Sequence, residues 1–404
     1  MPIRLTVWFE TLRSRLWLVP ALFAIGAVIA AIVTVTIDRT LGPEATGPFV
    51  FGGGPESARS LLSTIAAAML SFTGLVFTVT MLVLQLASSQ LSPRVTRTFL
   101  RDRNNQIVLG IFVATFVYAL LVLREVRSEV DAAFVPSIAV WWAFVLLLAS
   151  IAAFIYYIDH MAHAMRASTV IASVAGETRA AIERCHPDPV GSEPEAALAV
   201  PVTTATVPGP DDPGVLDGID LPKLFHLAAE AGAVIELLVM VGDAVPGGAP
   251  VARLRGGGPV DDDAIRGALT FGQERTMDQD PGFGFRQLVD IAVRALSPGI
   301  NDPTTAAHVI DQLHDLLRRL AGRHIPGPQR TDAAGGLRVI VACRTWEDYL
   351  AIACDEIRSY GADSIQVNAG LRRMLDDLAG VVPDDRRPAV RRERAKLPAE
   401  PIGT

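Results

Sequence analysis

The sequence predicts a membrane α-helical protein with four transmembrane helices, followed by a cytoplasmic α+β domain. Two observations predict this fold class. Four long apolar runs occur before residue 160, and no comparable run follows. None of the four contains Asp, Glu, Lys or Arg, although 20% of the whole chain is charged and its net charge is -7. Apolar residues are therefore concentrated in the first part of the chain.

The predicted transmembrane domain covers residues 1–158. Its apolar runs lie at about 16–37, 61–87, 107–123 and 134–158. A helix needs roughly 20 apolar residues to cross about 30 Å of hydrocarbon, and one charge at its centre costs at least about 2.5–3.5 kcal/mol. Charge-free runs of this length therefore favour crossing helices. The first run is too long for a cleaved signal peptide and lacks a small-residue cleavage site, so it is interpreted as an anchor.

Basic residues in the short loops predict the orientation. Seven arginines precede the first run or follow the second, and four lie in the other two loops. The first group is Arg4, Arg13, Arg15, Arg94, Arg97, Arg101 and Arg103; the second is Arg39, Arg59, Arg124 and Arg127. Positively charged loops stay in the cytoplasm, so both termini are expected there. Because only two of the 36 basic residues are lysine, which suggests a GC-rich bacterial genome, the expected location is a bacterial inner membrane.

The polar part of the chain divides into four predicted segments. Residues 159–186 contain no helix breaker before Pro187, so the fourth helix is expected to continue as a helical stalk. Residues 198–258 carry short β-like runs. Residues 259–380 are mainly helical. Residues 381–404 are basic and broken by prolines, which predicts a disordered tail; a weak contact with anionic lipid is the less common alternative for its basic residues.

The β-rich segment contains one recognisable pattern. Residues 234–254 resemble half of a biotinyl- or lipoyl-type barrel-sandwich module, in which Gly-Asp-x-Val-x-x-Gly reverses the chain. The segment is therefore expected to be a small barrel-sandwich-like module. No lysine stands in or near the turn, so no covalent cofactor is expected.

The second apolar run carries a polar face. Thr64, Ser71, Thr78 and Gln85 recur every seven residues, a spacing that drifts only about 20° per step on a straight helix. Such groups either pack against another helix or line an aqueous path. Both alternatives stay open, with helix packing the commoner role; if a pore exists, this face is its wall.

A second polar cluster lies in the mainly helical segment. Its members are Arg275, Arg286, Asp290, Arg294, Asn301 and Asp302. Arg286, Asp290 and Arg294 are four residues apart and share one helix face. Asp302 followed by a proline is typical of a helix N-cap, and Asn301 suits a turn. Their ordinary role is structural; the alternative is an anion or small polar ligand at this helix N-terminus, held by Arg286 or Arg294.

Several chemical classes lack support. The chain contains no Gly-x-Ser-x-Gly, His-Glu-x-x-His, Cys-x-x-Cys or phosphate-binding loop motif, so no catalytic residue, metal ligand or cofactor is assigned, and an enzyme is not expected. A net charge of -7 gives no indication of a strongly basic surface that would bind nucleic acid. Cys185, Cys343 and Cys354 are odd in number and widely spaced, which favours reduced core thiols.

Four strings identify a resemblance. They are Leu82–Arg94 (LVLQLASSQLSPR), Phe99–Arg103 (FLRDR), Gly272–Thr276 (GQERT) and Phe285–Pro303 (FRQLVDIAVRALSPGINDP). With these strings the chain resembles the bacterial family of predicted membrane proteins catalogued as domain of unknown function 2254, from about Arg15 to Asp377. The resemblance implies an integral membrane protein and brings no activity, substrate or catalytic residue.

Two functional hypotheses follow. The first is a homo-oligomeric passive channel or transport-like protein, with the second helix lining the path and the cytoplasmic domain gating or sensing a small ion. The absence of charged residues from the runs argues against an ion-coupled pump. The alternative is a membrane-anchored ligand-binding, regulatory or scaffold protein without transport. The expected partners are the lipid bilayer, further copies of the chain and a small ion or anionic ligand.

Overall fold

The computed structural model describes residues 17–41, 51–90, 103–127, 134–164, 166–190, 198–332 and 334–398. The chain forms two compact units, Met1–Arg166 (unit 1) and Ala167–Thr404 (unit 2). Most of the arginines that predict the orientation lie outside the described residues, namely Arg4, Arg13, Arg15, Arg94, Arg97 and Arg101.

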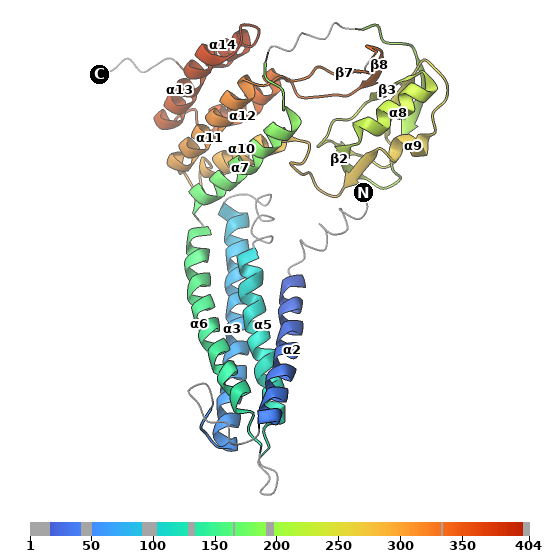
Figure 1. Ribbon diagram of the computed structural model, residues 1–404. Helices are drawn as coiled ribbons and strands as arrows, with labels where there is room; N and C mark the ends of the chain where they lie inside the picture. Colours follow the sequence, from blue (N-terminus) through green and yellow to red (C-terminus); the bar gives the residue numbers. More distant parts are fainter. Residues whose placement is uncertain are drawn as a thin grey trace, which may run out of the picture. The chain divides into compact units, whose positions relative to one another are not determined.

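Unit 1 is a bundle of four long helices (Figure 1). They are α2 (Leu18–Leu41), α3 (Pro55–Gln90), α5 (Arg103–Glu125) and α6 (Ser137–Ala164). Each contains a stretch long and apolar enough to cross a membrane, as the sequence predicted. The central helix is α5, which contacts the other three; 44% of its apolar stretch is buried, against 22% in each of the others.

The interior of unit 1 is filled by rings and paired hydroxyl groups. Phe72 lies against Phe112 and Phe154, with ring centroids 6.0 and 4.9 Å apart. The hydroxyls of Thr115 and Ser150 lie 2.9 Å apart between α5 and α6. Hydroxyl groups in the interior of unit 1 are therefore paired across neighbouring helices, which the apolar surroundings favour.

The predicted helical stalk consists of two helices instead of one. α6 ends at Ala164, Arg166 is not helical, and α7 (Ala167–Cys185) begins after it. α7 is amphipathic, and its apolar side is buried within unit 2, where it packs against two later helices. Burial of that face explains why α7 belongs to unit 2.

Unit 2 contains two sheets. The larger has the strand order β1 (Thr203–Pro208), β5 (Pro250–Arg255), β3 (Val234–Leu237), β8 (Leu337–Ile340) and β7 (Gln329–Thr331). The smaller has the order β4 (Ala244–Val245), β2 (Gly214–Ile219) and β6 (Leu269–Gly272). All strand pairs are antiparallel except β3 with β8.

The barrel-sandwich expectation is not confirmed. β3 and β5 do pair antiparallel on either side of the Gly-Asp turn. The free edge of β3, however, pairs with β8 from much later in the sequence, so the described strands form open sheets and no closed barrel. The half-module pattern correctly predicted the local hairpin of β3 and β5. The pairing that would close a barrel is absent from the described strands, because the other edge of β3 pairs with β8.

The described residues of unit 2 form seven further helices. They are α8 (Leu221–Ala231), α9 (Asp262–Arg266), α10 (Pro281–Ala295), α11 (Pro303–Ala321), α12 (Trp346–Tyr360), α13 (Ile365–Val381) and α14 (Arg387–Ala395). Asp220 caps α8 by accepting a hydrogen bond from the Lys223 backbone N–H at 3.1 Å, as its position before Leu-Pro predicted. α7, α10, α11 and α12 pack against one another, and α8 lies against β3 and β8.

The basic tail is ordered over most of its length. Residues 381–398 were expected to be disordered; instead α14 packs against α12 and α13. Arg394 pairs with Asp376 at 2.7 Å and Lys396 with Asp355 at 3.2 Å, while Val390 is fully buried. These ion pairs occupy basic groups for which contact with anionic lipid was the alternative. Residues 399–404 lie outside the described part.

Candidate functional site

The polar face of α3 lies on the outside of unit 1. Thr64, Ser71, Thr78 and Gln85 are all exposed. The three hydroxyls donate to backbone carbonyls four residues earlier on α3, at 2.8, 3.1 and 2.9 Å. The face therefore packs against no other helix of the described chain and lines no path through the bundle interior.

A buried carboxylate in unit 1 was not anticipated. Asp38 directly follows the first apolar run, and its side chain is 6% exposed. Its two oxygens accept hydrogen bonds at 2.9 Å from the backbone N–H groups of Ile138 and Ala139, at the start of α6. Asp38 thus caps a helix a hundred positions later, which no local pattern reveals.

Asp38→Ala is expected to lower the unfolding free energy of unit 1 by about 2 kcal/mol, because two N–H groups at the α6 N-terminus lose a charged acceptor. Thermal unfolding in detergent micelles would measure the loss. Arg39→Gln is the control, since its ion pair with Glu125 is 55% exposed on the arginine side and should contribute less than about 1 kcal/mol. Equal losses in both variants would contradict the capping role.

The predicted cluster of unit 2 separates into distinct arrangements, the first around Asp280. This carboxylate is 4% exposed and caps α10 through the Phe283 N–H. Arg275 donates to it from Nε at 2.6 Å, and its Nη2 forms an ion pair with the same carboxylate oxygen at 2.6 Å. The guanidinium of Arg275 also lies over the Phe283 ring. Arg344 approaches the other carboxylate oxygen at 3.5 Å. The signal that could have identified Asp280 is the Asp-Pro pair that it forms with Pro281, the same pattern that marks Asp302.

Arg286 is engaged by its own chain. It donates to Asp290 at 2.7 Å on the same helix face, as the spacing predicted. Its two terminal nitrogens both bond to Glu356 of α12, one of them at 2.8 Å. These bonds hold the pKa of Glu356 below its usual range. Each of the three guanidinium nitrogens thereby has an acceptor within the protein, which disfavours Arg286 as the holder of a free anion.

The turn before α11 is stabilised by contacts between residues close together in the sequence. Asn301 adopts φ 51°, a left-handed conformation that Asn tolerates better than most residues. Asp302 accepts bonds from the Thr305 hydroxyl at 2.6 Å and the Thr305 N–H at 3.0 Å, which lowers the pKa of its carboxyl. Arg294 is exposed in the last turn of α10. The Asp302 carboxylate therefore occupies the N-terminus of α11, the position at which an anion or small polar ligand was the alternative expectation.

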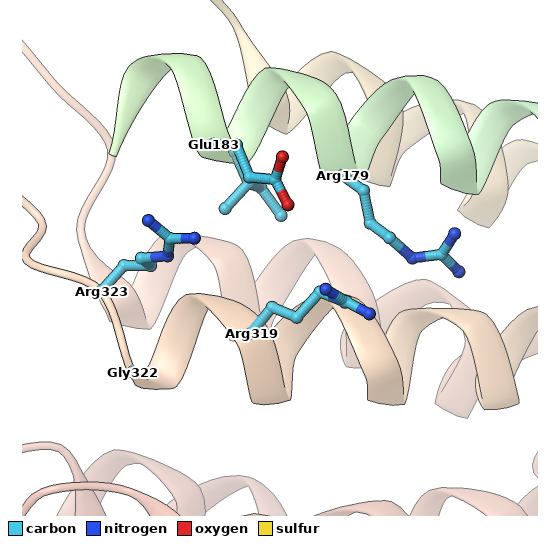
Figure 2. Close-up of a pocket in the computed structure, with 6 residues that line it drawn as sticks. Arg179, Glu183, Arg319, Gly322 and Arg323 are labelled. Carbon is cyan, nitrogen blue, oxygen red and sulfur yellow. The ribbon is translucent and has the colours of Figure 1, made fainter. Parts of the chain in front are cut away.

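A cationic cavity lies between α7 and α11 (Figure 2). Its volume is about 250 Å³, and it is lined by Arg179, Ile182, Glu183, Arg319, Gly322 and Arg323. Figure 2 shows the charged side chains of both helices directed into the space between them. Sequence reasoning missed this site. Part of the signal was present, because Arg179 and Glu183 are four residues apart on one face of α7. Arg323 follows the end of α11, so its position beside Arg319 at the cavity is set by the fold.

The arginines of the cavity are fixed by neighbours. Asp315 accepts bonds from Arg179 Nε at 2.8 Å and Arg319 Nε at 3.0 Å. Burial alone would raise the pKa of Asp315, but these bonds outweigh it and the pKa is lowered. Arg323 donates from Nη1 to the carbonyls of Pro187 and His186, at 2.8 and 3.3 Å.

His186 follows α7 and is 9% exposed. Its Nε2 lies 3.4 Å from the Tyr349 hydroxyl, and its Nδ1 has no partner among the described residues. Burial, followed by the nearby charges of Arg386, His324 and Arg323, lowers the pKa of His186 to about 4. The imidazole is therefore neutral in the folded protein at physiological pH.

Unit 2 is expected to lose about 2 kcal/mol of stability between pH 7.5 and pH 5 through His186. The unfolded imidazole takes up a proton near its ordinary pKa of 6.5, whereas the folded one does so only near 4, so stability present above pH 6.5 is lost as the pH falls. Denaturant unfolding at several pH values would measure this. His186→Gln should flatten the profile, and His226→Gln, at a 72% exposed histidine, should leave it unchanged.

Metal and thiol chemistry receive no support from the described residues. Within those ranges, no group of three His, Cys, Asp or Glu side chains is placed to hold a metal ion. Cys185, Cys343 and Cys354 are free thiols, and burial raises the pKa of each. Raised pKa values keep these thiols protonated and weakly reactive.

Comparison with known proteins finds relatives that match nearly the whole chain. Uncharacterised proteins of Mycobacterium bovis and Mycobacterium tuberculosis are each 35% identical to it over 402 residues, covering 96% of this chain and 76% of the relative. No solved structure matches the chain. The family model described as predicted membrane protein (DUF2254) matches residues 13–377, which confirms the resemblance carried by the four sequence strings. The chain therefore belongs to the DUF2254 family of predicted membrane proteins.

Proposed function

We propose that this membrane protein anchors unit 2, a ligand-binding or regulatory domain, at the cytoplasmic face of a bacterial inner membrane. The arginine-rich loops support that orientation, because positively charged loops remain on the cytoplasmic side. The mycobacterial relatives support a bacterial membrane. In this proposal the role of unit 1 is anchoring, and unit 2 contacts the ligand.

The filled interior of unit 1 is the observation that carries the proposal. Leu62, Met69 and Phe112 are fully buried, and the phenylalanine rings pack across the bundle. Inward hydroxyls are paired, as between Thr80 and Tyr157 at 2.8 Å. A single copy therefore offers no polar route through its described helices, whereas unit 2 has an open cavity lined by charges.

A flux assay tests the proposal. Purified full-length protein in liposomes is expected to give no flux of K⁺, Cl⁻ or phosphate above that of protein-free vesicles, over pH 5 to 8. Unit 2 should at the same time bind a soluble ligand, detected as a rise in its unfolding midpoint. Protein-dependent, saturable flux would refute an anchoring role for unit 1.

A passive path between copies is the second candidate, favoured by the outward polar face of α3. A pore at the centre of an oligomer is lined by the outer surface of each protomer, which is where Thr64, Ser71 and Thr78 lie. Native mass spectrometry would then show an oligomer. Ser71→Leu and Thr78→Leu should abolish its flux, while Thr36→Leu should not, because Thr36 is an equally exposed hydroxyl on α2 bonded to its own helix at 2.6 Å.

A further inference from the structure

We propose that the cavity between α7 and α11 binds a small anion of the phosphate-monoester class. The inference rests on the proposed ligand-binding role of unit 2 and assigns the ligand's chemistry. Three arginines line one space of about 250 Å³: Arg179 of α7, Arg319 of α11 and Arg323, which directly follows the end of α11. Sites for drug-sized molecules usually measure roughly 300–1,000 Å³, so this cavity suits a small phosphorylated metabolite or free phosphate.

The arginines retain donors for a ligand. The hydrogen bonds of Arg319 in the described structure use Nε alone, and those of Arg323 use Nη1 alone. Those of Arg179 use Nε and Nη2. Each guanidinium therefore keeps at least one nitrogen without a protein acceptor among the described residues. Because Asp315 already orients two of them, little side-chain freedom is lost when a ligand binds.

The charge of the cavity favours an anion. The wall of the cavity carries three arginines and one carboxylate, Glu183 (Figure 2). The carboxylate of Asp315 is bonded to two of these arginines, Arg179 and Arg319. Burial is the main cause of the lowered pKa of His186, and the positive charges of Arg386 and Arg323 near this end of α11 contribute to it. The bonds of Arg323 to the carbonyls after α7 use one of its nitrogens, and the bonds of Arg319 to Asp315 use Nε, so each side chain has terminal nitrogens left for a ligand.

Phosphate fits three guanidiniums better than a carboxylate does. A carboxylate presents two oxygens and one charge, which a single bidentate arginine satisfies. A phosphate monoester carries about -1.5 to -2 charges at pH 7 and three strong acceptor oxygens. Arg179 of α7, Arg319 of α11 and Arg323 just after α11 supply positive charge around the cavity for that group, and the apolar side chain of Ile182 also lines it.

Phosphate titration of the full-length protein in phosphatidylcholine nanodiscs tests the inference. Inorganic phosphate is added at constant ionic strength, and ³¹P line broadening and the unfolding midpoint of unit 2 are followed. We expect saturable binding that Arg319→Gln weakens roughly tenfold or more, because a charge-assisted donor is lost. Arg318→Gln is the matched control: Arg318 is adjacent, similarly exposed, and pairs with Asp377 away from the cavity.

A variant with the opposite effect separates ligand binding from misfolding. Glu183→Gln removes the wall carboxylate and should strengthen phosphate binding severalfold, which an unfolded protein cannot do. Absence of saturable binding to the wild type, or equal weakening by Arg318→Gln and Arg319→Gln, would overturn the inference. The titration is repeated in nanodiscs that contain phosphatidic acid, to identify the source of the phosphate group. If phosphatidic acid leaves the ³¹P line broadening and the midpoint of the phosphate titration unchanged, the ligand is soluble phosphate. If phosphatidic acid competes with inorganic phosphate, the ligand is a lipid headgroup. The flux assay is independent of all these results.

Discussion

Asp280→Ala is expected to lower the unfolding free energy of unit 2 by about 3–5 kcal/mol. The substitution leaves two guanidiniums, those of Arg275 and Arg344, which are only 24% and 18% exposed, without their shared carboxylate. It also removes the N-cap of α10. A buried charge without its partner carries most of its desolvation penalty, which explains why the loss should exceed that of any surface ion pair.

Hydrogen exchange across α10 would measure the loss, because the amide protection there reports opening of unit 2. Asp280→Asn should have an intermediate effect, since the amide oxygen still accepts from the Phe283 N–H but the charge is gone. Asp311→Ala serves as control: Asp311 is 53% exposed, pairs with Arg373, and should change stability by no more than about 1 kcal/mol. A comparable loss in Asp311→Ala would rule out the buried ion pair as the cause.

Gly284→Val is expected to destabilise unit 2 by about 3 kcal/mol or more. At Gly284 of α10, a Cβ atom would stand 2.0 Å from Oγ1 and 2.8 Å from Cγ2 of Thr178, which is fully buried on α7. Interiors are close-packed, so the two helices would have to separate. Chemical denaturation of the full-length protein gives the change in unfolding free energy.

Two companion variants test the steric explanation. Thr178→Gly combined with Gly284→Val should recover part of the loss, a coupling that a double-mutant cycle detects. Gly176→Ala on α7, where an added Cβ meets nothing within 4 Å, should instead stabilise by about 0.5–1 kcal/mol. If Gly176→Ala destabilises unit 2, or if the double variant recovers no stability, the close packing of α10 against α7 at Gly284 is not the cause of the loss.

Local signals in the sequence predicted local structure well. Charge-free runs correctly indicated four apolar helices, and Asp220 and Asp302 correctly indicated helix caps. Such features depend on neighbours within a few residues, or on the medium around a helix. The Arg286–Asp290 pair, four residues apart, belongs to the same class.

Features set by distant partners escaped prediction. A seven-residue repeat shows that Thr64 and Ser71 share a face, but not that this face lies outside the bundle. Glu356 follows Arg286 by 70 positions and uses its donors. The cationic cavity likewise combines residues of α7 and α11, which no short motif connects.

The parallel pairing of β3 with β8 has a consequence for synthesis. Every element from β5 to β7 lies between these two strands in the chain. Translation proceeds at about 5–20 residues per second, so β3 waits several seconds with an unpaired edge. Non-local pairings form late in folding, and open edges recruit foreign strands. The nascent larger sheet therefore depends on protection from misassembly until residue 340 has emerged from the ribosome.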